Sequence, residues 1–434
     1  MRSRFWLIAA SAFLFAAPAA AAELSAPERT MIETVDAEQE RTLSMLETWV
    51  NQNSGSQNAA GVRAVGKMLS SELEPLGFKV DWVDMKAAGR AGHIIARHKG
   101  NGRGKRMLLI GHLDTVFEPD SPFQKWERNG DRGIGPGAGD DKGGMAVMIA
   151  ALRAMQAAGT LRKADITVVL TGDEEDAGDP IELARGPLVE AGKWADVALD
   201  FEGLAQKEGK DMGSIARRSS DSWTLTVTGR TGHSSGVMHP DYGANYELAR
   251  IIDAFRRELG EDKLTYNVGM IGGGASADLD SGRIRLAATG KTNIIAATAV
   301  ARGDLRAISQ DQIDRTKAKM QAIVGSSLPG TKAEIHFDPG GYPPMAPTEG
   351  NRALLARLNT VNSDMGLEPM GELDPMERGA GDISFVAADT DGLVGLGSAG
   401  SGSHAPGESV DIPSISRQAK RAAILMSRLA TERR

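Results

Sequence analysis

Apolar and polar positions alternate along the first part of the chain as they do in β-strands. Residues 78–83 and 92–97 alternate with a period of two, which predicts two neighbouring strands. Residues 107–110 and 166–170 are short, continuous apolar runs, which are typical of strands buried on both faces. We therefore expect a mixed, mainly parallel sheet.

Apolar residues also recur at helical spacing, which predicts helices over residues 26–49 and 143–158. Strands that alternate with helices in this way are typical of an α/β domain whose sheet is flanked by helices. Because 434 residues are too many for one hydrophobic core, we expect two domains.

The pattern changes near Ser219 to that of a small α+β module. The expected elements are a strand over 223–228, a helix over 245–259, strands around Asn293 and Asp304, and a helix over 309–324. A Gly- and Pro-rich break follows at residues 339–344, and α/β character then resumes. We therefore predict that residues 216–338 are inserted between two parts of a catalytic domain, residues 23–215 and 339–434.

The N-terminus has the pattern of a secretory signal peptide over residues 1–22. Arg2 and Arg4 precede an apolar stretch at 5–17, and the small residues Ala20–Ala22 offer a cleavage site. The alternative is an N-terminal membrane anchor, although the stretch is short for spanning a bilayer. We expect a periplasmic or secreted protein without membrane attachment after cleavage.

Composition narrows the possible chemistry. The net charge of −7 argues against binding nucleic acid, which normally requires a basic face. The chain contains no cysteine, so disulfides, a thiol nucleophile and zinc–thiolate sites are excluded. Any bound metal must therefore be held by His, Asp and Glu.

His112 and Asp114 follow directly after a predicted buried strand, where ligands bind in parallel α/β sheets. Two residues apart, they point to the same side of an extended chain. A histidine backed by a carboxylate is a common metal-binding arrangement. A capped turn with an incidental histidine is the alternative interpretation.

Asp140 and Asp141 lie in a Gly-rich segment that leads into a predicted helix. Acids at the start of a helix are favoured by its dipole, and that alone could explain them. A phosphate-binding loop is rejected, because the glycine spacing is wrong and adjacent aspartates would repel a phosphate. A carboxylate that bridges two cations fits better.

More acidic residues follow other predicted strands. Glu174 and Glu175 come after the strand at 166–170, Asp200 and Glu202 end another apolar run, and His404 lies in a Gly-rich segment. Adjacent acids on a solvated loop are common, but the positions of these acids favour one shared site.

Together these motifs resemble the co-catalytic di-zinc aminoacylase/carboxypeptidase metallopeptidase family. That family includes glutamate carboxypeptidases, acetylornithine deacetylase and succinyl-diaminopimelate desuccinylase. The shared motifs are Gly-His-x-Asp-Thr, Gly-Asp-Asp-Lys-Gly-Gly, Asp-Glu-Glu and a late histidine, and the glutamate carboxypeptidases are the most similar. The resemblance implies that the inserted module is a ferredoxin-like lid or dimerisation domain, and that the protein is a homodimer.

The resemblance also implies a ligand set for two Zn²⁺ ions, with Co²⁺ or Mn²⁺ as alternatives. His112 and Glu202 would hold one ion, Glu175 and His404 the other, and Asp140 would bridge both. Asp200, two residues before Glu202, is the alternative ligand at that position.

Catalytic roles follow from the same resemblance. Glu174 matches the general base, Asp114 the carboxylate behind the His112 ligand, and His233 the lid-domain histidine that stabilises an oxyanion. A hairpin-loop histidine is the other interpretation of His233. The family usually has a cis peptide after the bridging residue, here Asp140.

Substrate recognition is implied at Asn293, Arg306 and Lys210. Arg306 would suit a carboxylate, since arginine binds carboxylates bidentately. Ala296 replaces a proline that is common in the family, so the loop at Asn293 can differ. An exposed lysine is the other interpretation of Lys210.

The sequence thus predicts a secreted, zinc-dependent exopeptidase that cleaves the amide bond of a small peptide by metal-activated water. A carboxypeptidase that releases a C-terminal, acidic amino acid is the first expectation, and an N-acyl amino acid deacylase is the alternative. A periplasmic zinc-binding protein is a remote alternative, because such proteins tend to carry a His-rich loop and the seven histidines here are scattered.

Overall fold

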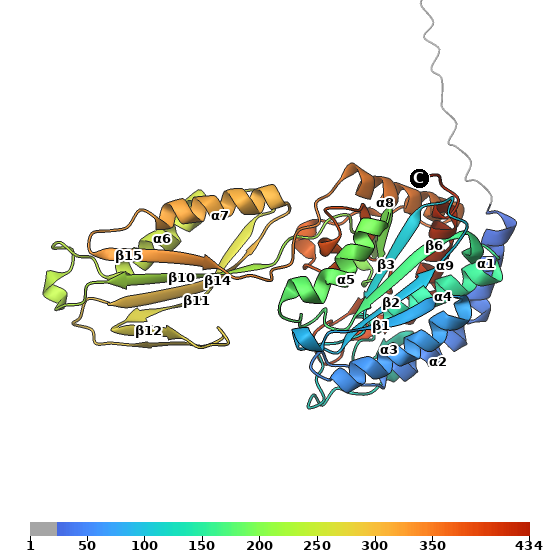
Figure 1. The fold of residues 1–434 in the computed structure, drawn as a ribbon, viewed down its shortest axis with the longest axis horizontal. Helices are drawn as coiled ribbons and strands as arrows, with labels where there is room; N and C mark the ends of the chain where they lie inside the picture. Colours follow the sequence, from blue (N-terminus) through green and yellow to red (C-terminus); the bar gives the residue numbers. More distant parts are fainter. Residues whose placement is uncertain (1–23) are drawn as a thin grey trace, which may run out of the picture.

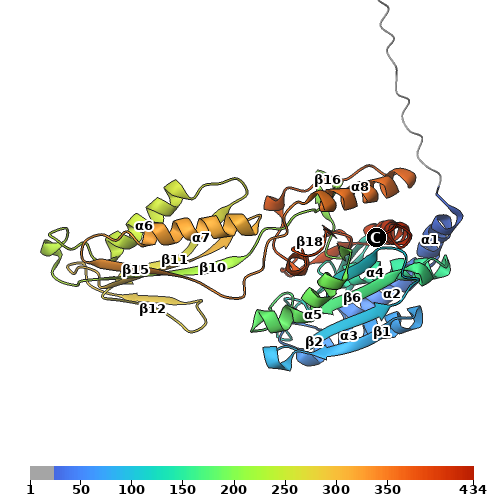
Figure 2. The same ribbon diagram turned by 45° about the horizontal axis from the view of Figure 1, so that its top comes forward.

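The computed structural model describes residues 24–434, which form two lobes joined by two connecting segments (Figure 1). The view in Figure 2 separates the same two lobes. The predicted signal peptide over residues 1–22 lies outside the described residues. Within residues 24–434, none of the helices combines the length and the apolar character needed to cross a membrane.

The larger lobe is built on a six-stranded sheet. In spatial order its strands are β1 (Lys79–Asp84), β2 (Gly92–His98), β6 (Asp165–Thr171), β3 (Arg106–His112), β7 (Val197–Asp200) and β17 (Gly392–Val394). β3 pairs in parallel with both β6 and β7, and β17 pairs in parallel with β7. β2 is antiparallel to both of its neighbours. The predicted mixed, mainly parallel sheet is confirmed.

Helices cover both faces of this sheet. Alternate residues of the central strand β3 point to opposite faces. Met107 and Leu109 of β3 pack into one hydrophobic core, and Leu108 and Ile110 pack into another. The first core is shared with α1 (Ala26–Ala37), α2 (Gln39–Val50), α3 (Ala59–Leu73), α4 (Lys142–Ala157), α8 (Glu349–Asp364) and α9 (Ile412–Leu429). The second core is shared with α5 (Ile181–Trp194).

The single helix predicted over residues 26–49 is wrong in one respect. α1 ends at Ala37 and α2 begins at Gln39, because Glu38 leaves the helical conformation with φ −98° and ψ 11°. The Glu38 carboxylate lies 2.8 Å from the guanidinium of Arg153 on α4. The break thus places an acid against a largely buried arginine.

The smaller lobe has a four-stranded antiparallel sheet in the order β11 (Thr265–Gly274), β14 (Thr298–Arg306), β10 (Asp221–Gly229) and β15 (Thr331–Phe337). α6 (Ala244–Glu258) and α7 (Gln310–Val324) lie on one face of it (Figures 1 and 2). A strand–helix–strand–strand–helix–strand order with this pairing is the ferredoxin-like arrangement, as expected. We call this lobe the lid lobe.

The lid lobe has its own hydrophobic core, centred on Trp223 of β10. Its ring meets that of Phe255 on α6 edge-on, with centroids 5.8 Å apart. A short hairpin of β12 (Ser276–Leu279) and β13 (Leu286–Thr289) lies beside the sheet. The strand expected around Asn293 does not form: Asn293 lies in a loop before β14, where the neighbouring Ile294 makes a single bridge to His233.

Two antiparallel connecting segments link the lobes, and they are bridged at Arg217 with Met345 and at Ser220 with Tyr342. Two smaller sheets complete the larger lobe. They contain β8 (Ala205–Lys207), β9 (Lys210–Gly213) and β16 (Gly371–Glu372), and β4 (Glu127–Asn129), β5 (Arg132–Ile134), β18 (Gly400–Ser401) and β19 (Ser409–Asp411).

Candidate metal centre and active site

Three parallel strands deliver acidic and histidine side chains to one edge of the main sheet. β3 ends at His112, β6 is followed by Glu174 and Glu175, and β7 is followed by Glu202. Because these strands are parallel neighbours, their carboxyl ends lie side by side. The prediction that the clusters share an edge is confirmed.

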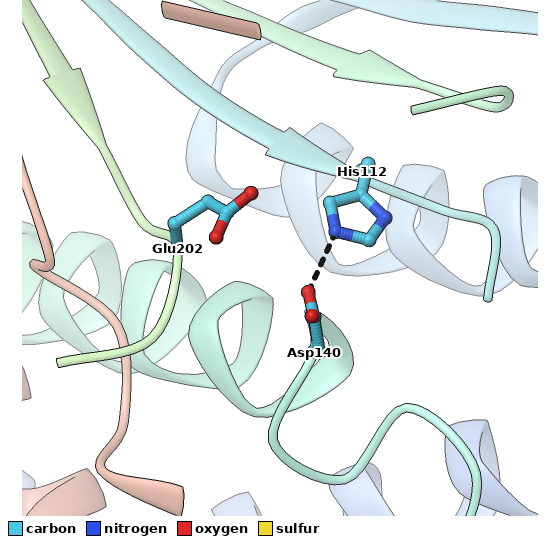
Figure 3. A group of neighbouring side chains, drawn as sticks. All are labelled: His112, Asp140 and Glu202. Carbon is cyan, nitrogen blue, oxygen red and sulfur yellow. Dashed lines mark hydrogen bonds and ion pairs between the residues drawn. The ribbon is translucent and has the colours of Figure 1, made fainter. Parts of the chain in front are cut away.

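His112, Asp140 and Glu202 form a first group whose potential ligand atoms all lie within 4.8 Å of one another. Nε2 of His112 is 3.0 Å from Oδ1 of Asp140. Figure 3 shows the imidazole at the end of β3 and the carboxylates of Asp140 and Glu202 gathered around a common space. Asp140 reaches this space from the loop that begins α4.

Asp140, Glu175 and His404 form a second group of the same kind. Nε2 of His404 lies 3.4 Å from Oδ2 of Asp140 and 3.0 Å from Oε2 of Glu175. Asp140 therefore offers one oxygen to each group. The structure brings together the residues predicted as metal ligands, and it places Asp140 between the two sets.

This donor set fits a pair of divalent cations. Each group combines an imidazole nitrogen with carboxylate oxygens, which are ligands that Zn²⁺ accepts. A carboxylate shared by two groups suits the spacing of about 3.5–4 Å that is usual for paired catalytic metals. The set contains no thiolate, so oxygen-preferring Mn²⁺ also fits.

Asp114 connects His112 to the segment that carries Glu174 and Glu175. Its fully buried carboxylate lies 3.3 Å from Nδ1 of His112 and accepts hydrogen bonds from the backbone N–H groups of Glu174 and Glu175 at 3.0 and 3.1 Å. Burial opposes the charged form of Asp114, but the hydrogen bonds from His112 and Ser56 outweigh it and lower its pKa. A charged Asp114 would fix the His112 ring for metal binding.

Glu174 lies at the site without belonging to either donor group. Burial raises its pKa well above the ordinary value, and the nearby charge of Glu202 raises it further. A carboxyl group that is not used as a ligand and that holds a proton more tightly than usual suits a proton-transfer role.

The segment that presents Asp140 is held by Glu408, which sequence reasoning missed. The buried Glu408 carboxylate accepts hydrogen bonds from the backbone N–H groups of Gly139 and Asp140 at 2.9 and 3.1 Å. The peptide bond between Asp140 and Asp141 is cis, as the resemblance implied. Glu408 belongs to no motif in the sequence, although it follows His404 by only four residues.

Asp200 and Glu202 occupy different positions. Glu202 is a member of the first donor group, whereas Asp200 is fully buried and accepts a hydrogen bond from the backbone N–H of Glu202 at 3.2 Å. The geometry favours Glu202 over Asp200 as the ligand.

The two groups open onto a cavity of about 490 Å³. Its wall includes two arginines, Arg217 and Arg378, which sequence reasoning also missed. Arg217 immediately precedes the lid lobe, and Arg378 lies in a loop without regular structure. Arg378 stands in the segment Arg-Gly-Ala-Gly-Asp, whose glycines are the only sequence signal of a functional loop.

The residues predicted to bind substrate do not line this cavity. His233 and Asn293 adjoin one another, since the Asn293 carbonyl accepts a hydrogen bond from the backbone N–H of Ser234. His233 follows the carboxyl end of β10 and Asn293 precedes β14, and that end of β10 points away from the main sheet (Figure 1). Arg306 ends β14 and pairs with Asp304, and Lys210 is exposed at the start of β9. Their roles in catalysis and substrate binding stay predictions.

Residues 108–428 match the model of Peptidase family M20/M25/M40. The chain is similar to carboxypeptidase G2 of Pseudomonas sp., with 29% identity over 410 residues that cover 92% of each chain. It is also similar to succinyl-diaminopimelate desuccinylase of Novosphingobium aromaticivorans, with 34% identity over 193 residues that cover 42% of this chain and 48% of the other.

Solved structures share the fold. An aminopeptidase PepT from Bacillus cereus superposes with a TM-score of 0.72 at 17% identity, covering 90% of this chain and 99% of that chain. A dinuclear metal-binding peptidase of family M20 from Bacillus subtilis superposes with a TM-score of 0.63 at 15% identity, covering 90% and 98%.

Proposed function

The chain belongs to Peptidase family M20/M25/M40, and from this we propose that it is a zinc-dependent exopeptidase that releases a C-terminal, acidic amino acid from a small peptide. The similarity to carboxypeptidase G2 over nearly the whole chain supports this activity. The alternative is an N-acyl amino acid deacylase, which the similarity to succinyl-diaminopimelate desuccinylases supports.

One observation carries the proposal. Two groups of His, Asp and Glu side chains share Asp140, and the unused carboxyl of Glu174 lies beside them in the same cavity. A protein that only stored zinc would need the ligands but not this extra carboxyl.

Two zinc ions bound here would polarise the amide carbonyl and lower the pKa of a water molecule. Glu174 would accept a proton from that water and then donate it to the leaving nitrogen. The raised pKa of Glu174 suits the first step, because a carboxylate with a raised pKa is a stronger base and accepts a proton more readily. Asp114 would position both Glu174, through its backbone N–H, and the ring of His112.

We further propose zinc as the physiological metal, with cobalt or manganese as alternatives. His112 and Glu202 would bind one ion, Glu175 and His404 the other, and Asp140 both. The donor chemistry supports this assignment.

Export and dimerisation are also proposals. The pattern of residues 1–22 supports a cleaved signal peptide and a periplasmic or secreted protein. His233 and Asn293 lie at the far end of the lid lobe, so we propose that they serve the cavity of a partner subunit in a homodimer. Arg306 and Lys210 would need a change in lobe arrangement, or the partner, to contact substrate.

The test is a hydrolysis panel on the zinc-loaded protein, with a chelator-treated sample beside it. The panel compares peptides with a C-terminal glutamate against acetyl and succinyl amino acids. E174Q is expected to keep two zinc ions per chain and lose turnover, while E190Q, at a surface ion pair, keeps both. Normal turnover by E174Q would remove the proposed proton carrier, and cleavage only of N-acyl amino acids would favour the deacylase.

A further inference from the structure

Two arginines face the candidate metal centre from one wall of the cavity. The side chains of Arg217 and Arg378 are only 5% and 12% exposed. Nη1 of Arg217 lies 3.6 Å from one oxygen of Glu202, and Nη2 of Arg378 lies 3.4 Å from the other. Both guanidinium groups therefore form ion pairs with the same carboxylate, which is a proposed metal ligand.

Arg217 is hydrogen-bonded to the loop that carries Arg378. Its Nε donates to the Gly379 carbonyl at 2.7 Å, and its Nη2 donates to the Ala380 carbonyl. Arg378 is held by fewer contacts, because its one side-chain hydrogen bond goes to Glu202. Arg217 thus holds the backbone beside Arg378, while Arg378 itself is directed at the cavity.

Each guanidinium keeps a buried N–H group that is not satisfied. Among residues 24–434, Nε of Arg378 and Nη1 of Arg217 have no hydrogen-bond partner. An unpaired buried donor costs about 1–3 kcal/mol, and more when it is charged. Nη1 of Arg217 lies just beyond hydrogen-bond distance of Glu202, whereas Arg378 makes a single side-chain hydrogen bond and lines the cavity, so Arg378 has donor capacity left for an acceptor there.

The balance of charge indicates that this acceptor is an anion. Two guanidiniums meet two carboxylates here, Glu202 and the buried Asp200, which is 3.8 Å from Arg217. When Glu202 binds a metal cation, its charge is shared with that cation. Asp200 then faces two arginines alone, and the wall has an excess of positive charge.

We propose that Arg378, positioned by Arg217, binds a carboxylate of the substrate. This inference rests on the proposed function and specifies its substrate class: small amides that carry an acidic group near the scissile bond. The carboxylate has two possible sources, the acyl part of the substrate or the α-carboxylate of the amino acid that leaves. Both offer the planar oxygen pair that an arginine binds bidentately.

Matched substrates test the proposal on the zinc-loaded protein. N-succinyl-alanine is compared with its succinamide analogue, which lacks the acyl carboxylate, and with N-succinyl-alaninamide, which lacks the leaving carboxylate. The wild type is expected to prefer the acid in one of these pairs. R378Q is expected to raise KM for that acid about tenfold to hundredfold and to erase the preference, leaving the neutral analogue unaffected. R378K is expected to keep part of it, since lysine retains the charge.

The matched control is R352Q, because Arg352 forms ion pairs on the surface with Glu349 and Glu372. A second readout needs no turnover: titration calorimetry of glutarate with the zinc-loaded wild type and R378Q. We expect R378Q to weaken glutarate binding about tenfold or more, and R352Q to leave it unchanged.

The experiments distinguish a failure of the proposed function from a failure of the role given to Arg378. A wild type that cleaves none of the amides refutes the proposed function, while the glutarate comparison still decides the role of Arg378. Equal effects of R378Q on acid and neutral substrates, or unchanged glutarate binding, overturn the inference. Should R378Q fail to fold, the wild type alone gives the answer. A wild type that does not prefer either acid over its neutral analogue overturns the inference.

Discussion

Replacing Asp114 by asparagine tests whether the buried carboxylate organises the centre. Oδ1 accepts from the backbone of Glu174 and lies near Nδ1 of His112, and Oδ2 accepts from Glu175 and from the Ser56 hydroxyl at 2.6 Å. Asparagine keeps the shape but turns one oxygen into a donor. Whichever way the amide faces, at least one backbone N–H then meets a donor instead of an acceptor.

The magnitude follows from burial. Asp114 is 0% exposed, so water cannot replace the lost hydrogen bond. An unpaired buried N–H and the lost charge together are expected to reduce the free energy of unfolding by about 3 kcal/mol. Loosening the carboxylate behind a histidine ligand is expected to weaken metal binding about tenfold to hundredfold.

Two assays measure these effects: urea unfolding of the metal-free protein, and zinc affinity by competition with a chelator of known strength. D120N is the control, because Asp120 is exposed on the same loop. If D114N binds zinc as tightly as the wild type, Asp114 does not position His112, and this part of the reasoning fails.

Three further changes probe other parts of the molecule. H404A removes the nitrogen of the second donor group, so metal analysis after dialysis is expected to find one zinc per chain instead of two; two retained ions would argue against this ligand. Y342F removes a hydroxyl that donates to the Glu174 carbonyl at 2.9 Å and accepts from the buried Arg185 at 2.7 Å; a loss of about 1–3 kcal/mol is expected in urea unfolding, and no loss would contradict it. W223A empties the centre of the lid-lobe core and is expected to cost about 3–5 kcal/mol, seen as an earlier unfolding transition; an unshifted transition would be inconsistent with that core.

The main sheet and the ligand loops were predictable because their signals are local. A continuous apolar run such as 107–110 needs no distant partner to indicate a buried strand, and its carboxyl end locates His112. Parallel neighbours then bring Glu175 and Glu202 to the same edge. Placing the distant His404 at that edge depended on the family resemblance, because nothing in its Gly-rich surroundings fixes where it folds.

Other features were not predictable because they depend on tertiary contacts. The break at Glu38 places its carboxylate on Arg153, more than a hundred positions along the chain. The strand expected around Asn293 does not form, and this segment makes only a single bridge. Helix α5 contains Pro187, which disfavours a helix in the sequence, and packing on the sheet stabilises it.

The arginine contacts show the same limitation most clearly. Arg185 is buried between Asp173 and Asp382, the latter 197 positions away, and it also donates to Tyr342 in the returning connecting segment. Arg378 reaches Glu202 across 176 positions. No spacing within the sequence encodes such pairs, so neither arginine was singled out from the sequence.

The most direct test of the central claim is a crystal structure of the zinc-loaded protein with anomalous scattering recorded at the zinc edge. We expect two peaks about 3.5–4 Å apart, both bound by Asp140. Each peak should lie about 2.0–2.2 Å from its other ligands, His112 with Glu202 and Glu175 with His404. A single peak, or zinc bound elsewhere with Asp140 free, would contradict the account.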